Sequence, residues 1–166
     1  MKKTGSFVLD WGTYNETTLV AVGLSYAETV KALKKYGCKK EAIDSVVSHE
    51  EDIQKILQRN NAGFFWWFSG KTIRTTILWL NDWEDDWPHY ETLIHELFHG
   101  IISVLGKERG MIQDNEIEEE AMAYQLEFLF KNCRRELQKL FAPRIRSVKK
   151  KRIIRKYGDR KAKKGD

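Results

Sequence analysis

The feature that most constrains this chain is a pair of histidines four residues apart, His95 and His99, inside an apolar run from Tyr90 to Leu105. The run is long enough for about four helical turns. In a helix, positions i and i+4 lie one above the other on the same face. We therefore expect the two imidazoles to point toward the same place, with Glu96 turned away from their face but still close to it.

The flanking residues predict where this helix begins and ends. Asp85, Asp86 and Pro88 form a typical start, because acids suit the positive end of a helix and proline suits its first turn. Gly106 is a typical stop. Between them, apolar residues cover nearly the whole circumference, which predicts a central, buried helix; these residues are Leu93, Ile94, Leu97, Phe98, Ile101, Ile102 and Leu105.

Two histidines and a glutamate on such a helix are costly to bury unless something satisfies them. The pattern His-Glu-x-x-His is typical of a zinc site, in which the histidines bind the metal and the glutamate acts as a general base on a water molecule. The alternative is that His95 and His99 are core histidines satisfied by hydrogen bonds, and that Glu96 lies on a solvated face.

A third metal ligand has to come from elsewhere in the chain. Catalytic zinc sites usually have three protein ligands, and neither of the two other histidines, His49 and His89, is suitably placed. A glutamate cluster opens the next predicted helix, which runs from about 116 to 140. It is either the source of the third ligand or a solvated first turn stabilised by the helix dipole.

The order of these motifs resembles that of the gluzincin zinc metallopeptidases, particularly the compact intracellular ones of phages, prophages and bacteria. The resemblance covers roughly residues 72–130. It rests on the His-Glu-x-x-His run and on Glu120-Ala121-Met122-Ala123-Tyr124, with twenty residues between His99 and Glu120. It implies a Zn²⁺ cofactor bound by His95, His99 and Glu120, with Glu96 as the catalytic residue.

The same resemblance implies the fold and the reaction. The fold would be a small zincin-like α+β domain, with a twisted antiparallel or mixed sheet packed on a central active-site helix. The reaction would be hydrolysis of a peptide bond in a protein or peptide substrate by a water that zinc activates. Glu96 would take the proton of that water and pass it to the leaving amine.

Several roles stay open between two interpretations. Glu119 is the alternative third ligand, because it shares the more apolar side of its helix with Leu126 and Phe130, but the motif context favours Glu120. Tyr124 is either an oxyanion-stabilising group or a core tyrosine. Glu91, like His89, either supports the metal ligands or has no role in the site.

The remaining segments predict a scaffold of hairpins and helices. A hairpin is expected at 6–10 and 17–22. Three helices are expected, at about 25–36, from about 40 or 41, and at about 48–58, the first and third opened by capping boxes at Ser25 and Ser48. A second hairpin is expected at 64–68 and 72–80. Its return strand is either a sheet edge that could pair with an extended substrate, or an ordinary cover for the core.

The charge is strongly segregated along the chain. Residues 144–166 contain 12 Lys or Arg and 2 Asp, a charge of +10, whereas the rest has 17 basic and 22 acidic residues, a charge of −5. We therefore predict a domain at 1–143 and a basic tail at 144–166. The tail is either a phosphate- or acid-binding segment or a solubilising arm. If it is the working part, the protein is instead a nucleic-acid-associated accessory protein with a structural or vestigial zinc site.

The composition predicts a soluble, cytoplasmic protein. Cys38 and Cys133 are too few for a disulfide framework and fit a reducing compartment. The opening Met1-Lys2-Lys3 faintly resembles a secretory signal, but Asp10 interrupts the apolar stretch behind it. No segment reaches the ~20 apolar residues of a membrane span. The sequence carries no prediction of the oligomeric state.

Overall fold

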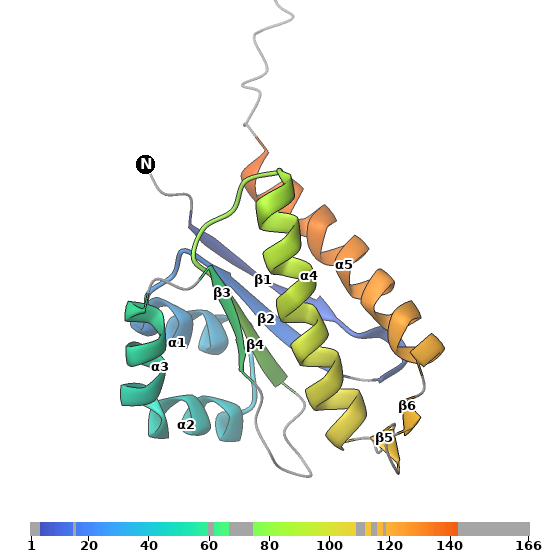
Figure 1. Cartoon of the computed structure of the whole chain (residues 1–166). Coiled ribbons are helices and arrows are strands. Elements are labelled where there is room, and N and C mark those ends of the chain that lie inside the picture. Colours follow the sequence, from blue (N-terminus) through green and yellow to red (C-terminus); the bar gives the residue numbers. More distant parts are fainter. Residues whose placement is uncertain are drawn as a thin grey trace, which may run out of the picture.

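The computed structural model describes residues 4–14, 16–59, 62–66, 75–108, 112–113, 116–117 and 119–142. These residues form an α+β fold with a four-stranded mixed sheet and five α-helices (Figure 1). The strands of the sheet are β1 (Gly5–Asp10), β2 (Thr17–Val22), β3 (Gly63–Trp66) and β4 (Thr75–Leu80). The helices are α1 (Tyr26–Lys35), α2 (Lys40–Ser48), α3 (Glu50–Gln58), α4 (Trp87–Ile101) and α5 (Glu119–Phe141). Shorter elements are η1 (Gly12–Tyr14), η2 (Ile102–Glu108), β5 (Ile112–Gln113) and β6 (Glu116–Ile117).

The sheet has the strand order β1-β2-β4-β3. Strands β1 and β2 form the predicted antiparallel hairpin, β2 pairs in parallel with β4, and β3 pairs antiparallel with β4. Because β2 and β4 are parallel, the chain has to cross over between them. Helices α1 to α3 lie in this crossover, in the connection between β2 and β3. The predicted return strand of the second hairpin is therefore an interior strand, and the edge interpretation of 72–80 is wrong. The described edges of the sheet are β1 and β3.

The two faces of the sheet are covered by different helices (Figure 1). On β2, Val20 and Val22 belong to the core under α4 and α5, whereas Leu19 and Ala21 belong to the core under α1 to α3. The side chains of β4 alternate between the same two cores, and all six of its residues are buried. This period of two arises because successive strand side chains point to opposite faces. The result is three layers, in which α4 lies along β3 and β4 and α5 lies along β1.

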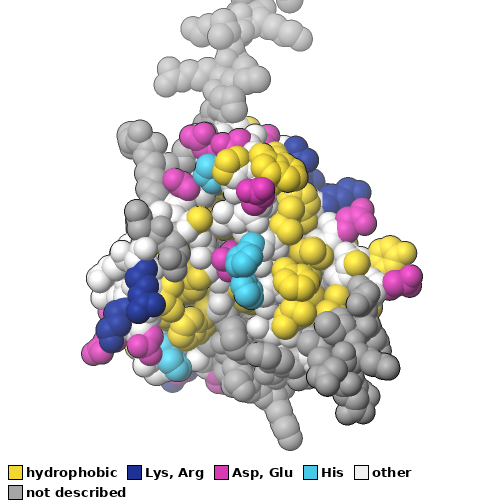
Figure 2. Space-filling model, viewed as in Figure 1, with side chains coloured by type: hydrophobic (Ala, Val, Ile, Leu, Met, Phe, Trp, Pro, Cys, Tyr) yellow, Lys and Arg dark blue, Asp and Glu magenta, His cyan; other side chains and the backbone are white. Residues whose placement is uncertain are grey.

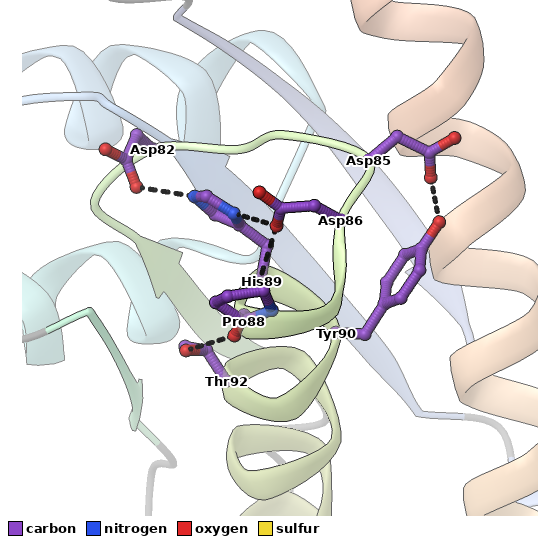
Figure 3. A network of polar contacts seen from close by, with 7 residues as sticks. All are labelled: Asp82, Asp85, Asp86, Pro88, His89, Tyr90 and Thr92. Atoms are coloured by element: carbon purple, nitrogen blue, oxygen red, sulfur yellow. Dashed lines mark hydrogen bonds and ion pairs between the residues drawn. The ribbon is translucent and has the colours of Figure 1, made fainter.

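Helix α4 begins as the sequence predicts. Asp86 is its N-cap, and its carboxylate accepts a hydrogen bond from the backbone N–H of His89 at 3.2 Å, while Pro88 lies in the first turn. The His89 ring lies between two carboxylates, with Nδ1 at 2.5 Å from Asp86 and Nε2 at 3.1 Å from Asp82 (Figure 3). These contacts fasten the connector 81–86 to the first turn of α4.

Helix α4 departs from its prediction at its end and in its burial. The helical path does not stop at Gly106 but continues as the π-helical segment η2 to Glu108. Nor is α4 buried all round: Leu93, Leu97 and Ile101 are buried, but Phe98 is 49% exposed. An apolar circumference predicts burial only if partners cover every side, and here the sheet and α5 leave one side open.

The other helices mostly follow their local signals. Ser25 and Glu28 form the predicted capping box of α1, and Gly37, with φ of 69°, follows the α1 C-cap. The capping box predicted at Ser48 is wrong, because Ser48 Oγ donates to Ser45 O and α3 begins at Glu50 after an uncapped His49. His49 is exposed. No helix among the described residues combines the length and hydropathy of a bilayer span. The predicted tail 144–166 lies outside the described residues.

The connector network predicts a pH dependence of folding. Burial alone lowers the pKa of His89, but hydrogen bonds to Asp86 and Asp82 and their negative charges outweigh it and raise that pKa above 6.5. Folding then favours the protonated ring, so this stabilisation is complete below about pH 6.5 and is lost as the pH rises through the folded-state pKa. Urea titrations should show the free energy of unfolding falling over this window more in the wild type than in His89→Gln. Identical pH profiles would contradict the network.

Candidate metal centre

The two histidines of the motif converge on the exposed side of α4. Their Nε2 atoms lie 3.0 Å apart, and their ring centroids are 4.5 Å apart with the planes at 86°. Both side chains are exposed. Figure 2 shows adjacent histidine side chains on the surface that faces the viewer, with hydrophobic side chains beside them. The alternative interpretation, that His95 and His99 are core histidines, is therefore wrong.

The spacing of the two nitrogens suits a shared metal ion. Two nitrogens at 2.0–2.1 Å from a tetrahedral zinc are about 3.3 Å apart. The separation between the Nε2 atoms of His95 and His99 differs from this by a few tenths of an ångström. Imidazole nitrogen is also a donor that zinc prefers. The pair thus fits two positions of a zinc coordination sphere, open to solvent on the outer side.

Glu96 lies on the inner side of α4, the reverse of the solvated face that the alternative interpretation predicts. Its side chain is 8% exposed and lies beside Gly63 of the edge strand β3. Burial raises the pKa of the Glu96 carboxyl, while the nearby His95 and His99 and, least of all, a backbone hydrogen bond from Phe65 oppose that rise. A partly buried carboxylate next to two imidazoles is a suitable proton acceptor.

The register of β3 explains why a backbone donor is available to Glu96. Ala62 O accepts from Asn81 N, and the same pairing makes Phe64 and Trp66 the β3 residues whose backbone groups face β4. The N–H of Phe65 therefore points to the open edge of the sheet. Helix α4 packs on this edge strand, and the Glu96 side chain lies beside Gly63 there.

Two glycines allow α4 to approach β3 this closely. A Cβ added to Gly63 would lie 2.9 Å from Trp79 O and 3.2 Å from Glu96 Cγ, so the Glu96 side chain occupies the space that a larger residue would need. A Cβ added to Gly100 would lie 2.6 Å from two ring carbons of Phe65. Neither glycine is recognisable as a contact point from local sequence patterns alone. For Gly100, the one signal is its position directly after His99.

The structure does not bring a third ligand to the two histidines. Glu120 is in the first turn of α5 with an exposed side chain, and the side chain of Glu119 lies outside the described residues. In the part of the chain that the structure describes, no three His, Cys, Asp or Glu side chains are grouped to hold a metal ion. The described centre thus consists of His95 and His99, with Glu96 behind them.

The residues with open roles lie as follows. Tyr124 is 70% exposed, so the core interpretation is wrong. Glu91 accepts a hydrogen bond from Trp87 Nε1 at 2.6 Å, and His89 contacts Asp82 and Asp86. These contacts of Glu91 and His89 stabilise the start of α4.

No known protein family, no characterised protein and no solved structure shows a significant match to this chain.

The close approach of α4 and β3 gives a direct prediction for Gly100→Ala. In an ordinary helix interior this change stabilises by roughly 1 kcal/mol. Here the added methyl group meets the Phe65 ring, so we expect destabilisation by about 1–3 kcal/mol in urea unfolding. The cost should be smaller in a Phe65→Leu background, because the smaller side chain relieves the contact. Stabilisation by Gly100→Ala in the wild type would show that Phe65 moves away without cost.

Proposed function

We propose that this protein is a zinc-dependent metallopeptidase with a zincin-like fold. One observation carries the proposal: His95 and His99 present their Nε2 atoms 3.0 Å apart on an exposed helix face, directly beside a buried Glu96 carboxylate. Both histidines and the carboxylate come from little more than one turn of α4. This combination of two converging nitrogen donors and a neighbouring base is what metal-assisted hydrolysis requires.

In this proposal His95 and His99 hold the metal ion. Glu120 becomes the third ligand when the first turn of α5 moves toward the two histidines. A zinc ion held there would supply Lewis-acid chemistry, lowering the pKa of water toward about 7 and polarising a carbonyl oxygen. The exposure of the two imidazoles leaves the outer side of the site open to a substrate.

Glu96 moves the proton. Its carboxylate takes a proton from the attacking water and gives it to the nitrogen of the leaving amine. Burial raises the pKa of Glu96, which favours holding the proton between these two transfers. The close packing of α4 on β3 restricts the position of this side chain.

The edge strand β3 supports a peptide as the substrate. It is the outer strand of the sheet among the described residues and lies next to α4. An extended peptide could pair with the outward-facing backbone groups of such a strand, and this would place a scissile bond near the histidines. The substrate-pairing role, expected from the sequence for 72–80, is thus reassigned to β3.

The metal site predicts a specific pattern of zinc loss. His95→Ala and His99→Ala should each weaken zinc binding by more than the ~10- to 100-fold that loss of an outer hydrogen-bond partner costs, because each removes a ligand. Elemental analysis and competition with a chromogenic chelator would measure this. The matched controls are His49→Ala and His89→Ala, which should bind zinc as the wild type does. Full zinc occupancy in His99→Ala would refute the site.

The same titration identifies the third ligand. Glu120→Ala should lose zinc affinity by at least ~10-fold, and Glu119→Ala by less. The reverse order would move the ligand to Glu119, and negligible effects of both would leave the acidic cluster as a solvated first turn.

The role of Glu96 is tested by Glu96→Gln. The amide keeps the size of the side chain and an oxygen that can accept from Phe65 N–H, so folding and zinc binding should persist. Hydrolysis of a quenched fluorescent peptide library should fall by at least ~10²-fold, because the proton acceptor is lost. Glu91→Gln, an exposed change on the same helix, should retain activity. Wild-type turnover in Glu96→Gln would exclude the proposed mechanism.

A second candidate function is favoured by the charge segregation. A tail with a charge of +10, joined to a domain with a charge of −5, suits a nucleic-acid-associated accessory protein. The domain by itself should repel phosphates. Under this alternative, Glu96→Gln leaves salt-sensitive binding to duplex DNA unchanged, and no peptide is hydrolysed by the wild type.

A further inference from the structure

A hollow of about 380 Å³ lies between the connector 81–86 and the last turns of α5. Its apolar part includes the buried Trp83 and Leu137, and its polar lining side chains are exposed. The full lining is Trp83, Glu84, Asp85, Leu137, Gln138, Phe141 and Ala142. An apolar hollow with a polar border is suited to a short amphipathic segment.

The border of the hollow is acidic. Asp85 already has partners, since it accepts from Gln138 Nε2 at 3.1 Å and from Tyr90 OH, and Arg134 Nε lies 3.9 Å away (Figure 3 shows the Tyr90 contact). Glu84 is exposed and, within the described ranges, takes part in no hydrogen bond or ion pair. A carboxylate beside an apolar surface, without a cation of its own, fits a partner that combines positive charge with an apolar side chain.

The chain itself supplies such a segment at this point. Ala142, a lining residue, donates its N–H to Gln138 O at 2.7 Å in the final turn of α5, and Pro143 follows. Proline has no N–H and disfavours a helical residue before it, so the sequence predicts a change of chain direction at the border of the hollow. The next residues are Arg144, Ile145 and Arg146.

The length and charge of this segment match the hollow. Four residues beyond Ala142 reach at most about 13 Å, and a sphere of the volume of the hollow is about 9 Å across. The tail carries +10 against −5 for the rest of the chain, so attraction to the border is expected. Ile145, between two arginines, provides the apolar group.

We propose that residues 143–148 dock into this hollow. Ile145 rests against the apolar lining, and the arginines on either side of it lie at the acidic border, where Arg144 pairs with Glu84. The part of the tail from Lys149 onward is then left to contact other molecules. This inference is independent of the metal centre and of any peptidase activity.

Limited trypsin digestion of the full-length protein tests the docking. Cleavage after Arg146 requires the undocked form, so its rate follows the population of that form when docking exchanges quickly. We expect Glu84→Lys to raise the rate of cleavage after Arg146 by at least about threefold, measured by mass spectrometry at early times, and to leave cleavage after Arg152 unchanged. Ile145→Ser should raise the same rate.

Two further variants make the test specific. Glu127→Lys, the same charge change at an exposed position of α5, should leave the rate at Arg146 as in the wild type. Adding Arg144→Glu to Glu84→Lys exchanges the two charges and should restore protection. Thermal melts would verify that every variant is folded. Equal rates at Arg146 in the wild type and Glu84→Lys, or an equal rise in Glu127→Lys, would overturn the proposal.

Discussion

The close packing of α4 against the edge strand β3 is the interaction on which the candidate centre depends. Gly100 lets the Phe65 ring lie directly under the helix, and Gly63 leaves room for the Glu96 side chain above the strand. A larger residue at Gly100 would meet the Phe65 ring, and one at Gly63 would meet Trp79 O and Glu96 Cγ, so either change would disturb the packing of helix and strand.

This packing divides the motif between the two sides of one helix. His95 and His99 face outward, where a metal ion and a substrate have access, while Glu96 is 8% exposed and faces the sheet. The division suits the proposed hydrolysis, because ligands need an open position on the metal whereas a general base benefits from partial burial that raises its pKa. It also accounts for the incomplete burial of α4, because the side that the sheet and α5 leave open is the side that carries His95 and His99.

The connector 81–86 links the start of α4 to the end of α5. Asp82 and Asp86 hold His89, and Asp85 contacts Tyr90 of α4 and Gln138 of α5. The same connector forms the acidic border of the hollow in which we place the first residues of the tail. One short acidic segment thus caps the helix of the candidate centre and, in our proposal, also holds the basic tail against the domain.

The sequence by itself determined the features that depend on neighbouring residues. The helix that carries His95 and His99, its Asp86 cap, the Ser25 capping box and the first hairpin all follow from local periodicity and capping. Tertiary structure alone decided that β4 is interior, that Glu96 is buried and that Gly100 is a contact point. The order of strands depends on pairing between β2 and β4, more than fifty residues apart, and burial depends on which surfaces meet. Neither is a property of a residue and its near neighbours, because both arise from packing between segments that are distant along the chain.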